Sequence, residues 1–168
     1  GTGYYPRSLT YGARLLANML PPKEKSPIMY QLAFGAYNRK IDDFRTKLDW
    51  LSSVDEVVDQ YMKDPYCGFI PTARFFYDLM TGLFRIHQTT LNRHIRKDLP
   101  LFLLSGHDDP VGDYGKGVWK VAEDYYSLGL RHIKTMLFEN ARHEILNEWN
   151  KVDVYAVIEQ WIKQQLSF

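Results

Sequence analysis

The sequence has little of two features that mark particular classes of protein. Cys67 is its one cysteine among 168 residues, so neither an internal disulfide nor a cysteine-based zinc site can form. We therefore expect a reducing, cytoplasmic location. Lys and Arg total 21 against 20 Asp and Glu, a net charge of +1. So small an excess does not attract nucleic-acid phosphates or an anionic membrane surface, and we expect neither as a partner.

Long apolar runs, repeats and a secretory leader are also missing. No stretch reaches the roughly 18 consecutive apolar residues of a transmembrane helix, so we predict no transmembrane segment. The chain opens at Gly1 without an initiator Met and without the charged-then-apolar order of a signal peptide. Such an opening is typical of the interior of a longer protein.

Residues 1–97 carry the patterns of helices joined by short loops. Apolar residues recur at helical spacing up to Leu20, and Pro21-Pro22 then ends that helix. Pro27 is predicted to begin a second helix, because proline is favoured in the first helical turn. A longer helix is expected after Pro71.

A third helix is predicted from a capping box, and the longer helix carries an apolar stripe. Ser53 stands three residues before Glu56, the spacing at which each side chain binds the other's backbone N–H. For the stripe, core packing is the simpler interpretation, and the lining of an acyl channel is the alternative. The stripe consists of Phe75, Phe76, Leu79, Met80 and Leu83.

From residue 98 onward the pattern changes to alternating strands and helices. Leu101–Leu104 is a short continuous apolar run, which is typical of a strand buried on both faces. Residues 133–138 form a second predicted strand, and helices are predicted near residues 114–128 and 152–166. The order strand, helix, strand, helix indicates an α/β fold with a parallel sheet and a right-handed crossover.

Candidate functional residues lie in the loops that follow the two predicted strands. Asp108 and Asp109 follow the first strand, and His143 follows the second. Functional residues gather at the carboxyl ends of parallel strands. A carboxylate that orients an imidazole, which then acts as a general base, requires this pair of residue types. The acid is open between Asp108 and Asp109, with Asp113 as a third candidate.

Several motifs together resemble the carboxyl-terminal half of a serine α/β-hydrolase, of the lysophospholipase and monoacylglycerol lipase (serine aminopeptidase S33-like) branch. The most specific is Ala141-Arg142-His143-Glu144-Ile145-Leu146-Asn147-Glu148. The Gly-x-x-Asp-Pro-Val turn at 106–111 and Gly115–Val118 also match. Asp49–Ser52 and Asp64–Phe69 resemble the family's cap. The resemblance covers essentially the whole chain.

The resemblance implies a partial α/β-hydrolase fold. Residues 1–97 would form a helical cap, or lid, and residues 98–168 two parallel strand–helix units of the core. The implied activity is hydrolysis of carboxylic esters by a Ser-His-Asp triad, with a small lipid or ester as substrate and peptides as an open alternative. By its place in the family's turn, Asp109 would be the triad acid, and His143 the base. No metal and no cofactor is implied.

Other residues of the His143 loop are given supporting roles. Glu144, Asn147 and Glu148 are expected to hold the loop and cap the next helix rather than to touch substrate. By chain order, Cys67 would suit a cysteine hydrolase on the same fold. No buried strand precedes it, as a nucleophile elbow requires, so we favour an incidental role.

One family motif is absent from the sequence. It contains no Gly-x-Ser-x-Gly elbow, which carries the nucleophile and precedes the Asp and the His in chain order. We therefore expect a fragment that is inactive alone. Its open sheet edge would pair with the missing amino-terminal half or with a second copy. The alternative is a non-catalytic module that binds an apolar ligand or a protein.

Overall fold

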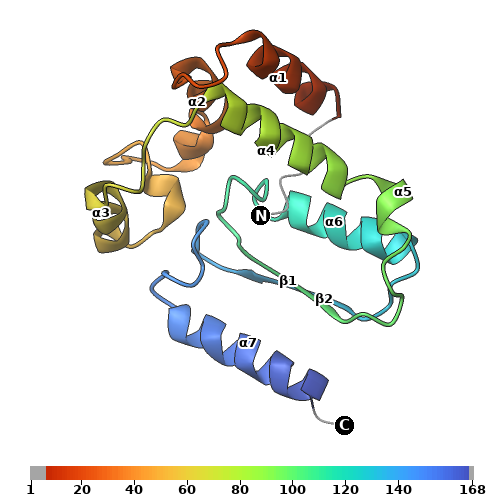
Figure 1. The fold of residues 1–168 in the computed structure, drawn as a ribbon. Coiled ribbons are helices and arrows are strands. Elements are labelled where there is room, and N and C mark those ends of the chain that lie inside the picture. The colour runs from red at the N-terminus through yellow and green to blue at the C-terminus, as the bar shows by residue number, and fades with distance from the viewer. Residues whose placement is uncertain (1–6, 167–168) are drawn as a thin grey trace.

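A computed structural model of the chain describes residues 7–166. Gly1–Pro6, on which the prediction of an interior chain start depends, lie outside the described residues. The elements in chain order are α1 (Arg7–Met19), α2 (Pro27–Phe34), the short 3₁₀ helices η1 (Tyr37–Lys40) and η2 (Asp49–Leu51), α3 (Asp55–Lys63), α4 (Ala73–Ile86), α5 (Thr89–Asn92), β1 (Leu101–Gly106), α6 (Lys116–Ser127), β2 (Ile133–Phe138) and α7 (Lys151–Leu166) (Figure 1).

The helical segment, residues 7–95, packs around a small apolar core of its own. Ala17 of α1, Met29 of α2 and Phe76 of α4 are each at most 2% exposed and contact one another. Side-chain hydroxyls cap the N-termini of two of these helices. The Ser26 hydroxyl accepts a hydrogen bond from the Met29 backbone N–H at the start of α2, and the Thr72 hydroxyl accepts one from the Phe75 N–H at the start of α4. The helices predicted before Pro21, from Pro27 and after Pro71 are thus confirmed as α1, α2 and α4.

The predicted capping box at the start of α3 is wrong. The helix begins at Asp55, one residue after Val54, and no side chain caps it. Ser53 instead directs both its backbone N–H and its hydroxyl to Glu148, 95 residues further along the chain. A buried carboxylate from the other end of the chain thus takes the hydroxyl that the local pattern assigns to the helix.

The sheet segment, residues 98–166, contains two parallel strands. They pair in register from Leu101 opposite Ile133 to Gly106 opposite Phe138. The helices α6 and α7 lie on opposite faces of this pair (Figure 1). On the α7 side, Val154 packs with Phe138 and Ala141. The predicted parallel α/β arrangement is confirmed.

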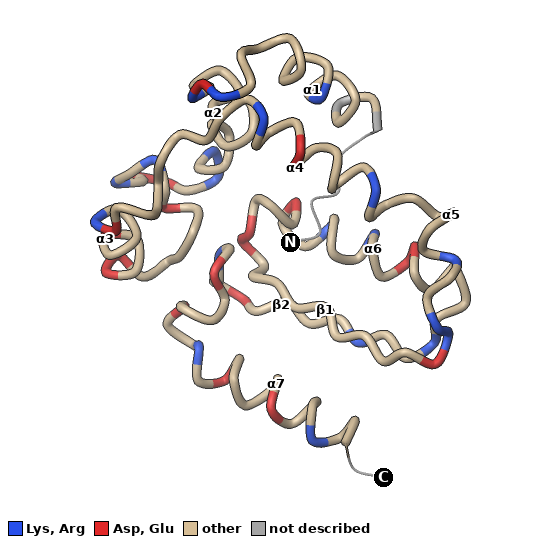
Figure 2. The backbone as a smooth tube through the Cα atoms, viewed as in Figure 1, with Lys and Arg blue, Asp and Glu red and all other residues tan. Residues whose placement is uncertain are grey.

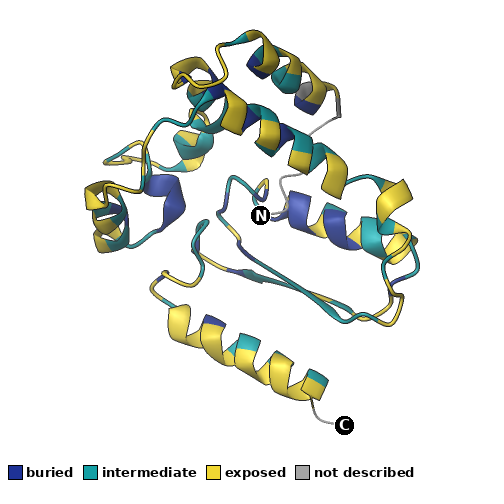
Figure 3. Ribbon diagram, viewed as in Figure 1, coloured by how far each residue is buried: buried dark blue, intermediate teal, exposed yellow. Residues whose placement is uncertain are grey.

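The first strand is less buried than its apolar run predicts. Residues Leu101–Leu104 are half-buried, and only the carboxyl end of β1 is fully buried (Figure 3). Within the described residues, β2 is the one strand that pairs with β1. One long edge of β1 therefore has its backbone groups unpaired by strand neighbours.

Charge is distributed along the chain rather than gathered in one segment. Lys and Arg alternate with Asp and Glu through both the helical and the sheet segment (Figure 2). No helix in residues 7–166 has the length and apolarity needed to cross a bilayer.

Candidate functional site

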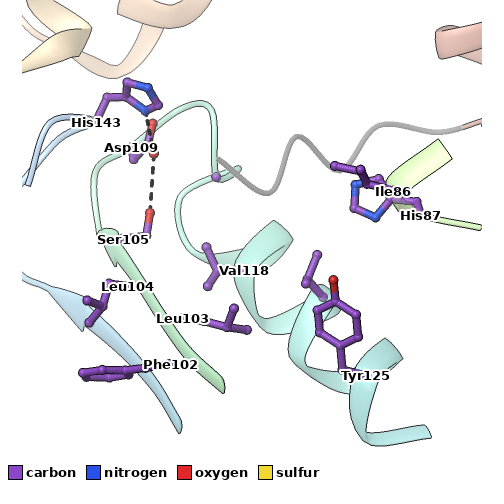
Figure 4. A pocket seen from close by; sticks show the side chains of 12 residues that line it. Ile86, His87, Phe102, Leu103, Leu104, Ser105, Asp109, Val118, Tyr125 and His143 are labelled. Carbon is purple, nitrogen blue, oxygen red and sulfur yellow. Dashed lines mark hydrogen bonds and ion pairs between the residues drawn. The ribbon is translucent and has the colours of Figure 1, made fainter. Parts of the chain in front are cut away.

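The structure brings Asp109 and His143 into direct contact. His143 Nδ1 lies 3.0 Å from Asp109 Oδ2 (Figure 4). Asp109 is only 4% exposed. Its other oxygen, Oδ1, accepts the backbone N–H of Val111 at 2.8 Å, and the Ser105 hydroxyl donates to Oδ2 at 3.4 Å. These donors fix the carboxylate beside the imidazole.

Backbone pairing at the ends of β1 and β2 produces this contact. The two strands end opposite each other at Gly106 and Phe138. The loops that follow remain paired, because His107 N–H donates to the Phe138 carbonyl and Asp108 N–H to that of Ala141. Asp109 and His143 therefore leave the same end of the sheet a few residues later.

Only one of the three candidate acids contacts His143. The half-buried Asp108 carboxylate is 2.9 Å from Nδ1 of its neighbour His107. Asp113 is exposed and lies in the turn before α6, with a positive φ of 49°. The side chain directly before Pro110 is the one directed to the imidazole.

His143 is held against the helical segment as well. Its ring centroid lies 5.2 Å from that of Trp50, and its backbone N–H donates to the Trp50 carbonyl at 3.4 Å. The side chain remains 30% exposed. When Nδ1 donates its proton to the Asp109 carboxylate, the lone pair of the neutral ring is on Nε2. An imidazole in this state can accept a proton from a hydroxyl group.

An apolar cavity of about 630 Å³ opens beside His143. Helices α1, α2 and α4 form most of its wall, and Val111 and His143 also line it. The apolar stripe of α4 divides between its two predicted roles. Phe76 is fully buried in the core, whereas Phe75, Leu79, Met80 and Leu83 line the cavity.

A second cavity, of about 390 Å³, lies along β1. It is lined by consecutive strand residues from Phe102 to Ser105, by Val118 and Val121 of α6, and by Asp109 and His143 (Figure 4). Consecutive residues of one strand line a cavity when its edge as well as its face is accessible. This cavity joins the unpaired edge of β1 to the Asp109–His143 pair.

The His143 loop is fastened to residues 49–53 by Glu148, which was expected to hold this loop, and by Arg142, whose role the sequence did not show. The Arg142 guanidinium donates to the carbonyls of Asp49 and Ser52, at 2.7 and 2.9 Å. The Glu148 carboxylate, 1% exposed, accepts from Ser53 and from the Arg142 backbone N–H. Arg142 and Glu148 both lie in the motif at residues 141–148 that carries the family resemblance, and this motif is the signal in the sequence that marks them.

Cys67 lies in the turn between α3 and α4 and is partly buried. Partial burial raises the pKa of its thiol, and the carboxylates of Asp64 and Glu144 raise it further. A raised pKa suppresses the nucleophilic thiolate. Within the part of the chain that the structure describes, no group of three His, Cys, Asp or Glu side chains could hold a metal ion.

Comparison with known proteins gives one family and several similar folds. The family model described as serine aminopeptidase, S33, matches residues 3–150. A thermostable carboxyl esterase from Bacillus coagulans, solved in complex with glycerol, is 26% identical, with a TM-score of 0.79 over 95% of this chain. No curated protein sequence matches the chain.

Two further solved structures share the fold. A lipase in its open form is 23% identical, with a TM-score of 0.77 over 94% of this chain. A monoacylglycerol lipase from Paleococcus ferrophilus is 17% identical, with a TM-score of 0.55 over 92% of this chain. The chain spans 51% of the esterase, 52% of the open-form lipase and 63% of the monoacylglycerol lipase.

Proposed function

Because the chain belongs to the serine aminopeptidase S33 family of hydrolases, we propose that it is part of a carboxylic ester hydrolase in which Asp109 and His143 are two members of a Ser-His-Asp triad. The observation that carries the proposal is the contact between these two side chains, since His143 also lines an apolar cavity. The likeness to a carboxyl esterase supports ester rather than amide substrates.

In the proposed mechanism, His143 takes the proton of a serine hydroxyl as that oxygen attacks the ester carbonyl. Asp109 accepts the Nδ1–H, which keeps Nε2 basic and stabilises the imidazolium that forms. His143 then returns the proton to the leaving alcohol. Water attacks the acyl-enzyme in the second half-reaction, with His143 again as base, and releases the acid.

The attacking serine is proposed to lie outside this sequence, on the amino-terminal half of the sheet. No Gly-x-Ser-x-Gly occurs in the 168 residues. The chain spans about half of the esterase and of the open-form lipase, and the edge of β1 is unpaired. That edge would receive the missing half of the sheet, and a second copy of this chain would compete for it.

The helical segment would act as the cap and select the acyl group. The cavity of about 630 Å³ is lined mainly by Leu, Met, Phe and Ala side chains, which suit an acyl chain and offer few polar partners. The ester carbonyl would then lie at the His143 end. Monoacylglycerols and lysophospholipids are the substrates that we favour.

The test is intact mass before and after treatment with a fluorophosphonate, a probe that labels activated serines. The complete protein is expected to gain one adduct, while its His143→Ala variant and the 168-residue chain alone gain none. Hydrolysis of a monoacylglycerol by the complete protein is measured in parallel. A complete protein that takes no adduct would overturn the proposal and leave a non-catalytic binding module.

A further inference from the structure

The Glu148 carboxylate is buried close to His143 but takes no part in the proposed triad. It is 1% exposed, and a charge this deeply buried requires strong hydrogen bonds. Its Oε1 accepts the backbone N–H groups of Ser53 and Arg142, at 2.9 and 2.8 Å, and its Oε2 accepts the Ser53 hydroxyl. One side chain thus binds the helical segment and the residue directly before His143.

Arg142 strengthens the same junction from the other direction. Its guanidinium donates to the Asp49 and Ser52 carbonyls, both in the helical segment. Two backbone hydrogen bonds also join the same two stretches of chain. His143 N–H donates to the Trp50 carbonyl at 3.4 Å, and Glu144 N–H donates to that of Leu51 at 2.8 Å. Hydrogen bonds from both side chains and backbone thus hold residues 142–144 against residues 49–53.

Asp109 alone does not fix the position of His143. The carboxylate orients the ring through Nδ1, whereas the backbone that carries the ring is held by residues 49–53. A displacement of the reacting groups by about 1 Å reduces turnover roughly 100-fold. A group that holds the His143 backbone therefore contributes to turnover without touching substrate.

We propose that Arg142 and Glu148 form a clasp that positions His143 by fastening its loop to the helical segment, with Glu148 as the principal positioning residue. The inference rests on the proposed function, in which His143 is the general base. It extends that function by placing part of the active-site geometry under the control of the helical segment. A movement of residues 49–53 would move His143 with it.

The test compares three variants of the complete protein with a short-chain ester, whose binding depends little on the cavity. Glu148→Ala removes all three acceptor contacts, and we expect kcat to fall about 100-fold while KM changes by less than about threefold. Glu148→Gln keeps Oε1 for both backbone donors, and its amide can donate to the Ser53 hydroxyl. It should remain within about threefold of the wild-type kcat.

Glu144→Ala is the matched control. It lies in the same loop, and its carboxylate binds only the exposed side chain of Asn147 among the hydrogen bonds that the structure gives it. We expect its kcat to equal that of the wild type. If Glu148→Ala keeps kcat within about twofold and loses only thermal stability, Glu148 is structural and the clasp is wrong.

A second measurement separates failure of the clasp from failure of the proposed function. The His143 Nδ1 proton that bonds Asp109 should give a downfield NMR resonance, observable whether or not the protein hydrolyses esters. The resonance should persist in Glu144→Ala and Glu148→Gln and disappear in Glu148→Ala. Its persistence in a folded Glu148→Ala variant would overturn the clasp even if hydrolysis is confirmed. A wild-type protein that shows neither the resonance nor activity would overturn both the proposed function and the clasp.

Ser53→Ala serves if circular dichroism shows that Glu148→Ala does not fold. This variant removes one of the three donors and keeps the Ser53 backbone N–H. The expected decrease in kcat is about 3- to 10-fold, with KM unchanged and the resonance weakened. A variant with wild-type kcat and an unchanged resonance would overturn the clasp.

Discussion

At the scale of single residues, the site depends on a carboxylate that burial and hydrogen bonds hold in one orientation. Asp109 receives Val111 N–H and the Ser105 hydroxyl and faces His143 Nδ1. The adjacent Asp108 is half-buried and faces His107 instead. Two neighbouring residues of one type thus have different environments, and that difference gives a clear mutational test.

Asp109→Asn should reduce kcat of the complete protein by about 10⁴-fold, with KM nearly unchanged. The Asn amide donates toward Nδ1, which favours the tautomer with its proton on Nε2 and so removes the base. Steady-state kinetics with a soluble ester would measure the effect. Asp108→Asn is the control, since the contact of its carboxylate among residues 7–166 is with the exposed ring of His107. Equal losses in the two variants would contradict the assignment of the acid.

Cys67→Ser should leave kcat and KM within about twofold of the wild type, because the thiol takes no part in the Asp109–His143 contact and its raised pKa suppresses the nucleophilic thiolate. Burial, followed by the charges of Asp64 and Glu144, raises its pKa. The thiolate fraction at a given pH is therefore below that of an ordinary cysteine. Alkylation by iodoacetamide should be slower than that of free cysteine at pH 8, and its rate should rise at a higher pH. Rapid alkylation at neutral pH would contradict this environment.

The sequence could predict which residue types form the site, but only part of their arrangement. His143 stands alone in its loop, so its position followed from the strand before it. The choice between Asp108 and Asp109 required either the family's turn or coordinates, because a shift of one residue reverses the direction of the side chain. Glu148 holds its loop as expected, but its partner Ser53 lies 95 residues away, and no local pattern marks so distant a partner. The same is true of the Asp49 and Ser52 carbonyls that Arg142 binds.

At the scale of helices and strands, local chemistry predicted most boundaries. β2 was expected at residues 133–138 and has those limits, and α7 begins one residue before its expected start. Both follow from apolar periodicity that agrees with the tertiary packing. The capping box at Ser53 fails because Glu148, 95 residues away, offers its hydroxyl a buried charged acceptor. The half-buried β1 departs from its apolar pattern because one edge has no strand beside it.

Gly106→Ala should destabilise the protein by about 1–3 kcal/mol and displace the His143 loop. A Cβ at this position would lie 2.1 Å from the Arg142 carbonyl oxygen and 2.2 Å from that of Ala141. Backbone oxygens cannot rotate away as side chains do. Urea unfolding would measure the stability, and the downfield His143 resonance would report the displacement.

Gly82→Ala should stabilise the protein, in contrast to Gly106→Ala. Among the residues that the structure describes, nothing lies within 4 Å of a Cβ added there, in the interior of α4. Alanine in a helix is more stable than glycine by about 0.5–1 kcal/mol. The urea midpoint should therefore rise while that of Gly106→Ala falls. A lower midpoint for Gly82→Ala would contradict the open space seen beside α4.

At the scale of the whole molecule, the unpaired edge of β1 is the most consequential surface. We predict that the 168-residue chain alone associates through this edge or aggregates, because unpaired backbone groups recruit further strands. Adding a separately produced amino-terminal half should yield a 1:1 complex that reacts with the fluorophosphonate. Light scattering would measure both states. A clean monomer at working concentration that ignores the added half would contradict the prediction.

The contact between Ser53 and Glu148 also bears on the order in which the molecule folds. Residues 95 positions apart must meet, and closing so long a loop is entropically slower than forming a helix. The helices before residue 95 can therefore form before the His143 loop joins them, so the active-site geometry would be the last part to appear. Pulse-labelled hydrogen exchange during refolding should show the Ser53 and Arg142 amides becoming protected after those of α4.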